Sequence, residues 1–495
     1  MSESLKYSGT CGLQHEEPLL FEHAHEQAES IALPGMDTSM NKDMAKFVRK
    51  NKAGIPGLSE PEAVRHFVRL SQWNHGIETG FYPLGSCTMK YNPRVNEQLA
   101  RLPGLTNIHP EQPEDSVQGV LGLLFELQQW LGEIAGLPCV TLQPAAGAHG
   151  ELTGLMMIRA ALDARGETAR RKVLVPDSAH GTNPASAALC GMHTFELKSG
   201  NDGRIDLDEL KRHLDNETAA LMLTNPNTAG MFESDIAEIC RLVHAAGGYV
   251  YGDGANLNAL VGIARPGDMG IDCLHINVHK TFATPHGGGG PGAGPVAVNE
   301  TLAPYLPVPR IEKDGNNYRL LHVSDTSIGP ILGTIGQTGV LLRAVAYIAA
   351  FGRTHLHKIA EDAVLNANYV LARLKEAYHV PFPGLCKHEC LLTDEVQNRH
   401  GIKTLDIAKR LIDLGFHPMT VYFPLIVHGA MLIEPTETES KDTLDAFCNA
   451  MLDIAAAVER GELDELKHAP QKAIRSRLDE TTAARRPVLT WPQAD

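Results

Sequence analysis

The sequence predicts an α/β fold with a mostly parallel sheet, followed by a smaller C-terminal α+β domain. Short apolar runs alternate with segments of helical periodicity, which is the order of elements in layered α/β proteins. These apolar runs are continuous, as expected for strands that are buried on both faces of a parallel sheet. Several of them end in polar or glycine-rich turns. Because ligands bind at the carboxyl ends of strands in open α/β sheets, the turns predict a small-molecule site.

The length and composition are those of a globular enzyme with more than one domain. The chain has 495 residues, of which 43% are hydrophobic and 21% are charged. This length suits two or three domains. The net charge of −15 argues against nucleic acid as a partner. The apolar stretches are too short to cross a membrane, so we expect no membrane association.

The cysteines and the N-terminal residues indicate a cytoplasmic protein. The nine cysteines are scattered, which favours a reducing compartment. The first thirty residues are polar and acidic and do not resemble a secretory signal. Cys386 and Cys390 flank His388, but no second ligand pair accompanies them, so we expect no metal site.

Four regions are expected along the chain. Residues 1–75 form a helical N-terminal arm, 76–330 a large domain, 331–470 a small domain and 471–495 a surface tail. Helical spacing of apolar residues predicts helices over 114–135, 152–161, 334–352 and 355–377. Apolar runs predict strands over residues 139–142, 172–175, 219–223, 249–251, 273–278, 421–427 and 430–433.

Lys280 is the first candidate for chemistry, because it follows the apolar run 273–278. A glycine-rich turn comes within seven residues and allows close approach of backbone to a ligand. A carbonyl cofactor needs an amine in such a shielded place to form an imine. The alternative is an exposed lysine beside a flexible loop.

Asp253 follows the preceding apolar run and favours the first of these alternatives. Pyridoxal phosphate (PLP) enzymes need a carboxylate at the pyridine nitrogen, so that the protonated ring accepts electrons. A strand-end Asp next to a strand-end Lys would serve two edges of one planar ring. Taken alone, Asp253 is equally a helix cap or turn residue.

Three further strand-end turns complete the predicted site. Gly147-Ala-His-Gly150 opens a helix whose free N–H groups suit a phosphate, although a generic tight turn is the alternative. His180 is placed to stack on a cofactor ring, or else has a structural role. Asn225 is placed to donate to a ring oxygen, or else forms an ordinary Asn-Pro turn.

These motifs closely resemble those of one known family. The residues that carry the resemblance are Gly147–Gly154, Asp177–Pro184, Asp253–Asn258, His279–Pro291, Tyr82–Pro93 and Ile433–Thr438. Together they resemble the glycine decarboxylase P-protein of the glycine cleavage system, from about residue 70 to 470. The length and the intact lysine are similar to those of subunit 2, the PLP-binding chain of the two-subunit form.

The resemblance implies a fold-type-I PLP-dependent transferase fold and an α2β2 heterotetramer with P-protein subunit 1. It implies decarboxylation of glycine, with transfer of the aminomethyl group to the lipoyl arm of H-protein. By motif, Lys280 is the Schiff-base lysine, Asp253 the pyridinium partner and His180 the catalytic stacking residue. The remaining cofactor-binding residues implied or proposed are Ala148, His149, Asn225, Asn256 and Thr281.

One feature departs from the wider fold: the C-terminal region offers no clear arginine for a substrate carboxylate. His428 and Tyr82 are the candidates in its place. A contribution to a neighbouring chain's phosphate site is considered for Ser324, Thr334 and Gln337. Two other functions stay open, a different fold-type-I enzyme such as a hydroxymethyltransferase or amino-acid decarboxylase, and a non-catalytic partner subunit.

Overall fold

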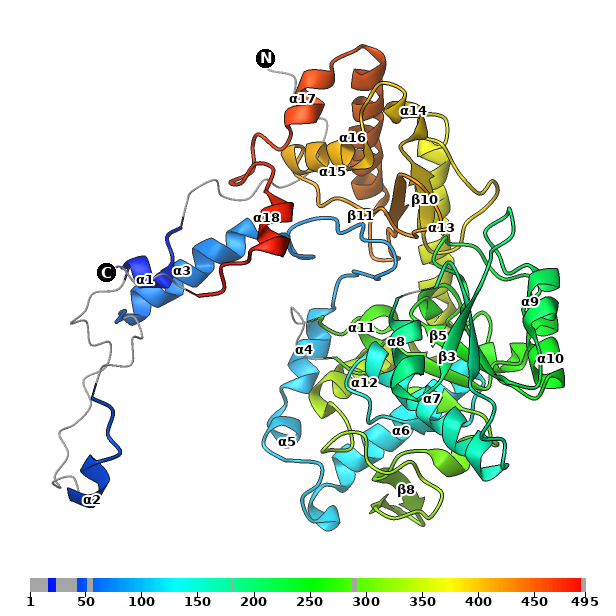
Figure 1. Ribbon diagram of the computed structural model, residues 1–495. Helices are drawn as coiled ribbons and strands as arrows, with labels where there is room; N and C mark the ends of the chain where they lie inside the picture. Colours follow the sequence, from blue (N-terminus) through cyan, green and yellow to red (C-terminus); the bar gives the residue numbers. More distant parts are fainter. Residues whose placement is uncertain (1–16, 24–41, 51–56, 180, 287–291, 491–495) are drawn as a thin grey trace.

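The computed structural model describes residues 17–23, 42–50, 57–179, 181–286 and 292–490. Figure 1 shows a large body built around the main sheet, a smaller body above it, and N-terminal helices extended to one side. These helices are α1 (Leu20–His23), α2 (Lys42–Ala45) and α3 (Glu60–Trp73). The C-terminal segment returns to α3, where the Arg475 guanidinium lies over the Trp73 ring.

The large body contains a seven-stranded sheet of order β1-β7-β6-β5-β4-β2-β3. Neighbouring strands from β6 to β3 are parallel, whereas β7 is antiparallel to both β1 and β6. The strands are β1 (Cys139–Thr141), β2 (Lys172–Pro176), β3 (His193–Leu197), β4 (Thr218–Thr224), β5 (Tyr249–Gly254), β6 (Cys273–Ile276) and β7 (Val296–Val298).

All five strands predicted for the seven-stranded sheet are present, and two further strands of this sheet, β3 and β7, were missed. Strand β3 lies at the edge of the sheet and is mostly exposed, so it has no continuous apolar run. Strand β7 has only three residues and follows the glycine-rich turn, which hid it. A mostly parallel sheet is therefore confirmed, with one antiparallel strand inserted near one edge.

Helices cover the sheet, and the periodicity of the sequence explains their buried faces. The helix predicted over 114–135 is α6 (Gln118–Ala135), preceded by the short helix η1 (Glu114–Ser116). Four leucines at helical spacing, 121, 124, 127 and 131, are fully buried in the core. Burial of each contributes about 1.5–3 kcal/mol. Helix α6 ends at Gly136, which takes the left-handed conformation that favours glycine.

The remaining helices of the large body, with a two-stranded hairpin, complete its layers. The helices are α4 (Arg94–Ala100), α5 (Pro103–Thr106), α7 (Gly147–Ala164), α8 (Thr182–Leu189), α9 (Leu207–His213), α10 (Ile236–Ala245), α11 (Val278–Thr281) and α12 (Thr338–His355), and the short ones are η2 (Leu257–Ala259), η3 (Pro266–Met269) and η4 (Ala303–Tyr305). The hairpin consists of β8 (Arg310–Asp314) and β9 (Asn317–Leu321).

The smaller body is an antiparallel sheet of order β10-β12-β11 with helices packed on it. Its strands are β10 (Cys390–Thr393), β11 (Thr420–Val421) and β12 (Ala430–Ile433). Its helices are α13 (His357–Leu374), α14 (Glu395–Asn398), α15 (Thr404–Asp413), α16 (Lys441–Glu459) and α17 (Leu463–His468), and α18 (Glu480–Arg485) follows. Buried residues of α13 pack first into the core of the large body and then into that of the small one.

One strand prediction in the smaller body was wrong and one strand was missed. The strand expected over 421–427 ends at Val421, because Tyr422 has a φ of 58° and Pro424 has no N–H for a ladder. Strand β10 was not predicted, since it has only four residues, three of them apolar, and follows a run of mixed polarity. In the described part of the chain, no helix is both long and apolar enough to cross a membrane.

Candidate active site

The carboxyl ends of β4, β5 and β6 bring the predicted polar residues to one edge of the main sheet. Asp253 in β5 pairs with Thr224 of β4 on one side and with His275 of β6 on the other. Asn225 follows Thr224 directly, and Lys280 lies in α11, a single turn of helix after β6. The parallel register therefore places these side chains next to one another, as expected from the sequence.

Lys280 is half-buried and reaches toward a segment from the N-terminal side of the chain. Its Nζ donates a hydrogen bond to the Ser86 carbonyl oxygen at 2.9 Å. The N–H of the same residue, Ser86, donates to Glu389 Oε2 at 2.7 Å. Ser86 has a φ of 63°, an uncommon conformation for a residue with a side chain, so its backbone is held there by its surroundings.

Asp253 lies in a network of buried polar side chains. Its Oδ1 accepts a hydrogen bond from the Ala255 N–H at 2.8 Å and lies 3.4 Å from His275 Nε2. His275 Nδ1 is 2.6 Å from the Tyr251 hydroxyl, and its Nε2 is 2.9 Å from Asn277 Nδ2. These partners fix the orientation of the imidazole beneath the carboxylate.

Glu151, the third acidic or basic member of this network, was not predicted. It lies in the first turns of α7, is buried, and its Oε2 has no hydrogen-bond partner among the described residues. Burial and then the neighbouring Asp253 carboxylate raise the pKa of Glu151 to about 8, against an opposing effect of Lys280. Glu151 is therefore a neutral acid at neutral pH. We call Glu151, Asp253 and His275 the sheet-edge group. One carboxyl oxygen or ring nitrogen from each of the three lies within 4.8 Å of those of the other two.

Helix α7 starts at Gly147, so Ala148 and His149 lie in its first turn, where backbone N–H groups are free. Ala148 is exposed and His149 is half-buried. His149 Nδ1 accepts from the Ala145 N–H at 3.2 Å, and burial lowers the pKa of His149. A Cβ at Gly147 would lie 2.3 Å from Asn277 Oδ1, which requires glycine at this close approach.

The amide and hydroxyl groups predicted to contact a cofactor differ in how many hydrogen bonds they make to the rest of the protein. Asn256 donates through Nδ2 to the Pro226 carbonyl at 2.8 Å, and so joins the loops after β4 and β5. Asn225 Oδ1 accepts from the Glu233 N–H, but Asn225 Nδ2 is buried without a partner in the described structure. The Thr281 hydroxyl is buried and equally unpaired within the described ranges. Asn225 and Thr281 thus have hydrogen-bonding capacity to spare.

His180 and most of the glycine-rich turn, residues 287–291, lie outside the described residues, so their predicted roles stay predictions. Two histidines on either side of Lys280 are described. The rings of His279 and His286 pack edge to face at 5.0 Å between centroids. Burial, and next the neighbouring His286, lowers the pKa of His279 to about 3, so this imidazole is neutral.

The smaller body contributes a second acidic group that the sequence did not reveal. His388 and Glu389 precede β10, and Glu434 follows β12; all three are fully buried. We call them the small-domain group, and call Glu389 and Glu434 the carboxyl pair. The Thr88 hydroxyl donates to Glu434 Oε1, just as the Ser86 N–H donates to Glu389. Charge from Lys280 acts on all three members of the group, so they lie near the reactive amine.

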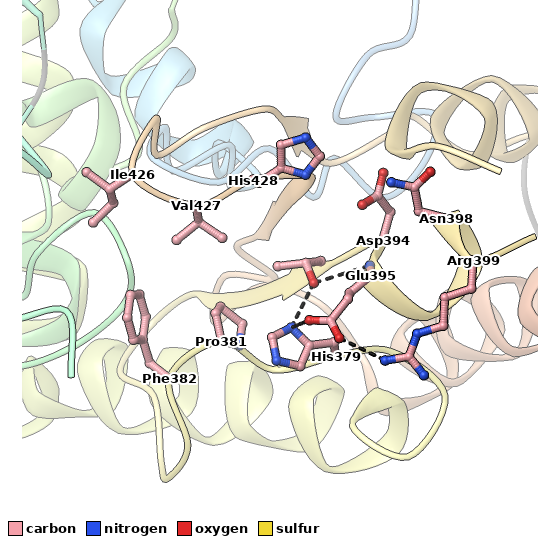
Figure 2. A pocket seen from close by; sticks show the side chains of 11 residues that line it. His379, Pro381, Phe382, Asp394, Glu395, Asn398, Arg399, Ile426, Val427 and His428 are labelled. Carbon is pink, nitrogen blue, oxygen red and sulfur yellow. Dashed lines mark hydrogen bonds and ion pairs between the residues drawn. The ribbon is translucent and has the colours of Figure 1, made fainter. Parts of the chain in front are cut away.

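Of the two candidates for a substrate-carboxylate ligand, His428 lies at the wrong end of the small sheet. In the antiparallel register, Cys390 pairs with Ile433 at the end next to the carboxyl pair, whereas Thr393 pairs with Ala430 at the other end. His428 lines a cavity of about 580 Å³ beyond that far end, together with His379 and Arg399 (Figure 2). Tyr82 packs on His417, with ring centroids 4.1 Å apart.

The residues that were missed come from the same motifs that carried the resemblance. Glu151 follows the predicted phosphate turn, Ser86 and Thr88 belong to the Tyr82–Pro93 motif, and Glu434 follows Ile433 in the C-terminal motif. Their position in these motifs was the available signal. Glu389 had no such signal, because only the pairing of β10 with β12 brings it to the site.

The fold and the strand-end site define the class of protein first: this is the fold of the fold-type-I PLP enzymes. A crystal structure of glycine decarboxylase (P-protein) in inhibitor-bound form matches with a TM-score of 0.68 and 22% identity, covering 87% of this chain and 93% of that one. A cysteine desulfurase from Thermococcus onnurineus matches with a TM-score of 0.59 and 15% identity, covering 77% of this chain and 96% of that one.

Sequence comparison then gives the family. Residues 22–318 match the family model of the glycine cleavage system P-protein, and residues 359–475 match that of the glycine dehydrogenase C-terminal domain. A protein of Caulobacter vibrioides called probable glycine dehydrogenase (decarboxylating) subunit 2 is 53% identical, covering 98% of this chain and 94% of its own. A protein of the same name from Exiguobacterium sibiricum is 54% identical, covering 96% and 97%. The chain belongs to the glycine cleavage system P-protein family.

Proposed function

We propose that this chain is the PLP-binding subunit 2 of a glycine decarboxylase and that it works with a P-protein subunit 1 in an α2β2 assembly. In this proposal it decarboxylates glycine and passes the aminomethyl group to the lipoyl arm of H-protein. The observation that carries it is the pairing of β5 with β6, which sets Asp253 and Lys280 at neighbouring strand ends. The family relationship supports glycine as the substrate.

The residues at the sheet edge fit the cofactor. Lys280 would hold PLP covalently, Asp253 would face the pyridine nitrogen, and the first turn of α7, with Ala148 and His149, would face the phosphate. The unpaired Asn225 Nδ2 and Thr281 hydroxyl supply buried hydrogen-bonding atoms for its polar groups. Asn256 would help to position the cofactor by holding together the loops after β4 and β5. His180 would stack on the cofactor ring. When bound, the cofactor supplies an electron sink for the bonding electron pair that the departing CO2 leaves on the glycine carbon.

The protein's own contribution is orientation and charge. His275, held by Tyr251 and Asn277, lies beside Asp253 and would limit the positions that its carboxyl group can take. Neutral Glu151 adds no second negative charge at this edge below its pKa of about 8. The cytoplasmic location also belongs to the proposal; the cysteines in the described part of the chain are all free, in keeping with a reducing compartment.

The test of this proposal is the imine at Lys280. The full-length chain with subunit 1 should absorb in the visible imine band, and borohydride should fix the cofactor to the peptide that contains Lys280. Lys280→Ala should lose both signals, whereas Lys198→Ala, which alters a lysine with a 69% exposed side chain, should keep them. A reducible imine that persists in Lys280→Ala would overturn the assignment.

The reaction is tested by exchange of isotope-labelled bicarbonate into the carboxyl group of glycine. Exchange should require this chain, subunit 1 and lipoylated H-protein together. Labelling of serine or of an aromatic amino acid instead of glycine would point to a different fold-type-I enzyme. Exchange that proceeds unchanged with Lys280→Ala would point to a non-catalytic subunit.

A further inference from the structure

The small-domain group places two carboxyl side chains directly opposite each other in a dry environment. Because Cys390 pairs with Ile433 in the antiparallel register, Glu389 and Glu434 are the next residues on each side. Like charges in this relation destabilise a sheet, and both side chains are fully buried. Two ionised carboxylates here would be strongly unfavourable unless a cation or a proton compensated one of them.

In each carboxyl of the pair, one oxygen accepts a hydrogen bond and the other oxygen has no partner in the described structure. Glu389 Oε2 accepts from the Ser86 N–H and Glu434 Oε1 from the Thr88 hydroxyl. Glu389 Oε1, Glu434 Oε2 and both ring nitrogens of His388 are buried without a hydrogen bond to any described residue. His388 Nε2 lies 3.9 Å from Glu389 Oε1 and 4.0 Å from Glu434 Oε1, so it faces the pair.

The neighbouring charged groups do not supply enough positive charge to compensate two ionised carboxylates, so one of the pair is expected to keep a proton. Lys90 Nζ donates hydrogen bonds to Glu437, Asn258 and the Thr281 carbonyl oxygen. Its positive charge also acts on Glu434. Burial lowers the pKa of His388 to about 3, so this side chain adds no positive charge. The other titratable groups that face the pair are Lys280, Glu437, Cys87, Cys386 and Cys390.

The pair titrates in the physiological range as a consequence of this environment. Burial raises the pKa of Glu434 to about 7, and Lys280 and Lys90 limit the increase. Burial, and then the charge of Glu434, raises the pKa of Glu389 as well. Two acids this close lose their protons in steps that belong to the pair rather than to either residue.

The backbone N–H and C=O groups of Ser86 link the pair to the Lys280 amine. The Ser86 carbonyl accepts from Lys280 Nζ, while the Ser86 N–H donates to Glu389. An ammonium ion must lose a proton before its nitrogen attacks a carbonyl carbon, and a nearby base with a pKa close to the working pH is suited to receive it.

We propose that Glu389 and Glu434 together hold one proton, and that they take up a second from Lys280 when that lysine forms its imine and return it when the lysine leaves the imine. In the forward step an N–H bond of the Lys280 ammonium breaks and an O–H bond forms on the pair. No electrons change hands, and the proton returns when the amine is released. The carboxyl pair acts through Lys280 and is a positioning element; the inference rests on the proposed role of Lys280.

The test follows the rate of imine formation against pH, with PLP added to the cofactor-free protein in complex with subunit 1. In the native chain the rate should rise through an inflection near pH 7, set by the pKa of Glu434 at about 7. Glu434→Gln and Glu389→Gln should each move this inflection to lower pH, because each leaves a lone acid. The double variant should lack the inflection and react on the order of 100-fold more slowly above it.

Matched variants separate this role from a structural one. Glu434→Asp keeps an acid and should restore the inflection. Glu439→Gln alters a half-buried acid whose pKa burial also raises to about 7, and it should leave the profile unchanged. Infrared spectra of the cofactor-free protein supply a readout independent of catalysis: each single Gln variant of the pair should lose the same carboxylic-acid band.

Three results would overturn the proposal. The first is an inflection that stays in place in both single variants and in the double variant. The second is a carboxylic-acid band that survives these substitutions. The third is a tightly bound divalent cation that Glu434→Gln releases, since a cation would hold both carboxyls ionised. Absence of any imine in the native chain is a different outcome, because it contradicts the proposed function of Lys280 itself.

Discussion

The sheet-edge group and the small-domain group have the same composition, two carboxyl side chains and one histidine, but their histidines are used differently. His275 contacts Tyr251, Asn277 and Asp253, and these contacts define its orientation. His388 makes no hydrogen bond in the part of the chain that the structure describes. In the first group one carboxyl is neutral and the other is held by a backbone N–H and an imidazole. In the second group the carboxyls face each other.

This difference indicates that the two groups have different roles around Lys280. A carboxyl group beside an imidazole that its own partners fix in place keeps a constant orientation, which would suit the proposed pairing of Asp253 with a pyridine nitrogen. Two acids that face each other, each with one oxygen that has no partner in the described structure, lose their protons in coupled steps, which suits exchange with an amine.

The largest effect should come from Asp253→Asn, which replaces the carboxyl group with an amide of nearly the same shape. We expect the rate of carboxyl exchange into glycine to fall about 10²–10³-fold, the range for loss of one group aimed at developing charge. Cofactor absorbance on the same sample checks that the imine still forms. If Asp253→Asn kept full activity, the sheet-edge group would have no electrostatic role and the contrast between the groups would fail.

Close backbone approaches on the two sides allow a second test. A Cβ at Gly254 would lie 1.9 Å from the His275 carbonyl oxygen inside the main sheet, and one at Gly85 would lie 2.4 Å from Leu432 Cγ. Overpacking of this kind typically reduces the free energy of unfolding by about 1–3 kcal/mol. We expect Gly254→Ala to be the more destabilising, because two paired strands have less freedom than the segment before Ser86.

Gly254→Ala and Gly85→Ala are compared by urea unfolding followed by circular dichroism, with Gly119→Ala as the control. Gly119 lies on α6 with nothing within 4 Å of an added Cβ, so alanine there should leave stability unchanged or raise it by up to about 1 kcal/mol. A larger loss in Gly85→Ala than in Gly254→Ala would contradict the expected ranking.

The smallest effect concerns the pH dependence of stability. The pKa of Glu151 is raised from 4.5 to about 8 in the folded protein, so between these values the folded state binds a proton that the unfolded state has lost. Stability from this group is therefore full below about pH 4.5 and is lost as the pH rises toward 8. Glu151→Gln should flatten this part of the stability profile, as measured by urea unfolding at several pH values. An unchanged slope would mean that Glu151 is already ionised.

The sequence predicted the sheet-edge half of the site better than the small-domain half, for a physical reason. Consecutive parallel strands end at the same edge, so Asp253 and Lys280 follow from strand boundaries alone. The small-domain group, residues 388–389 and 434, meets its hydrogen-bond partners in residues 86–88 only through antiparallel pairing and a bridge from Leu84 to Ile433. Strand β10 carried no recognisable signal, so its contribution could not be anticipated. His428 was assigned to the wrong end of the same sheet for this reason.

Ser86 links Lys280 to the smaller body. Residues 83–85 are attached to that body through hydrogen bonds from Gly85 N to Leu432 O, from Glu434 N to Pro83 O and from the Thr420 hydroxyl to Gly85 O. Lys280 itself belongs to the large body, after β6. A hinge rotation of the smaller body would therefore carry the acceptor of the Lys280 hydrogen bond with it. The length of the hydrogen bond from Lys280 Nζ to the Ser86 carbonyl oxygen would then depend on the angle between the two bodies.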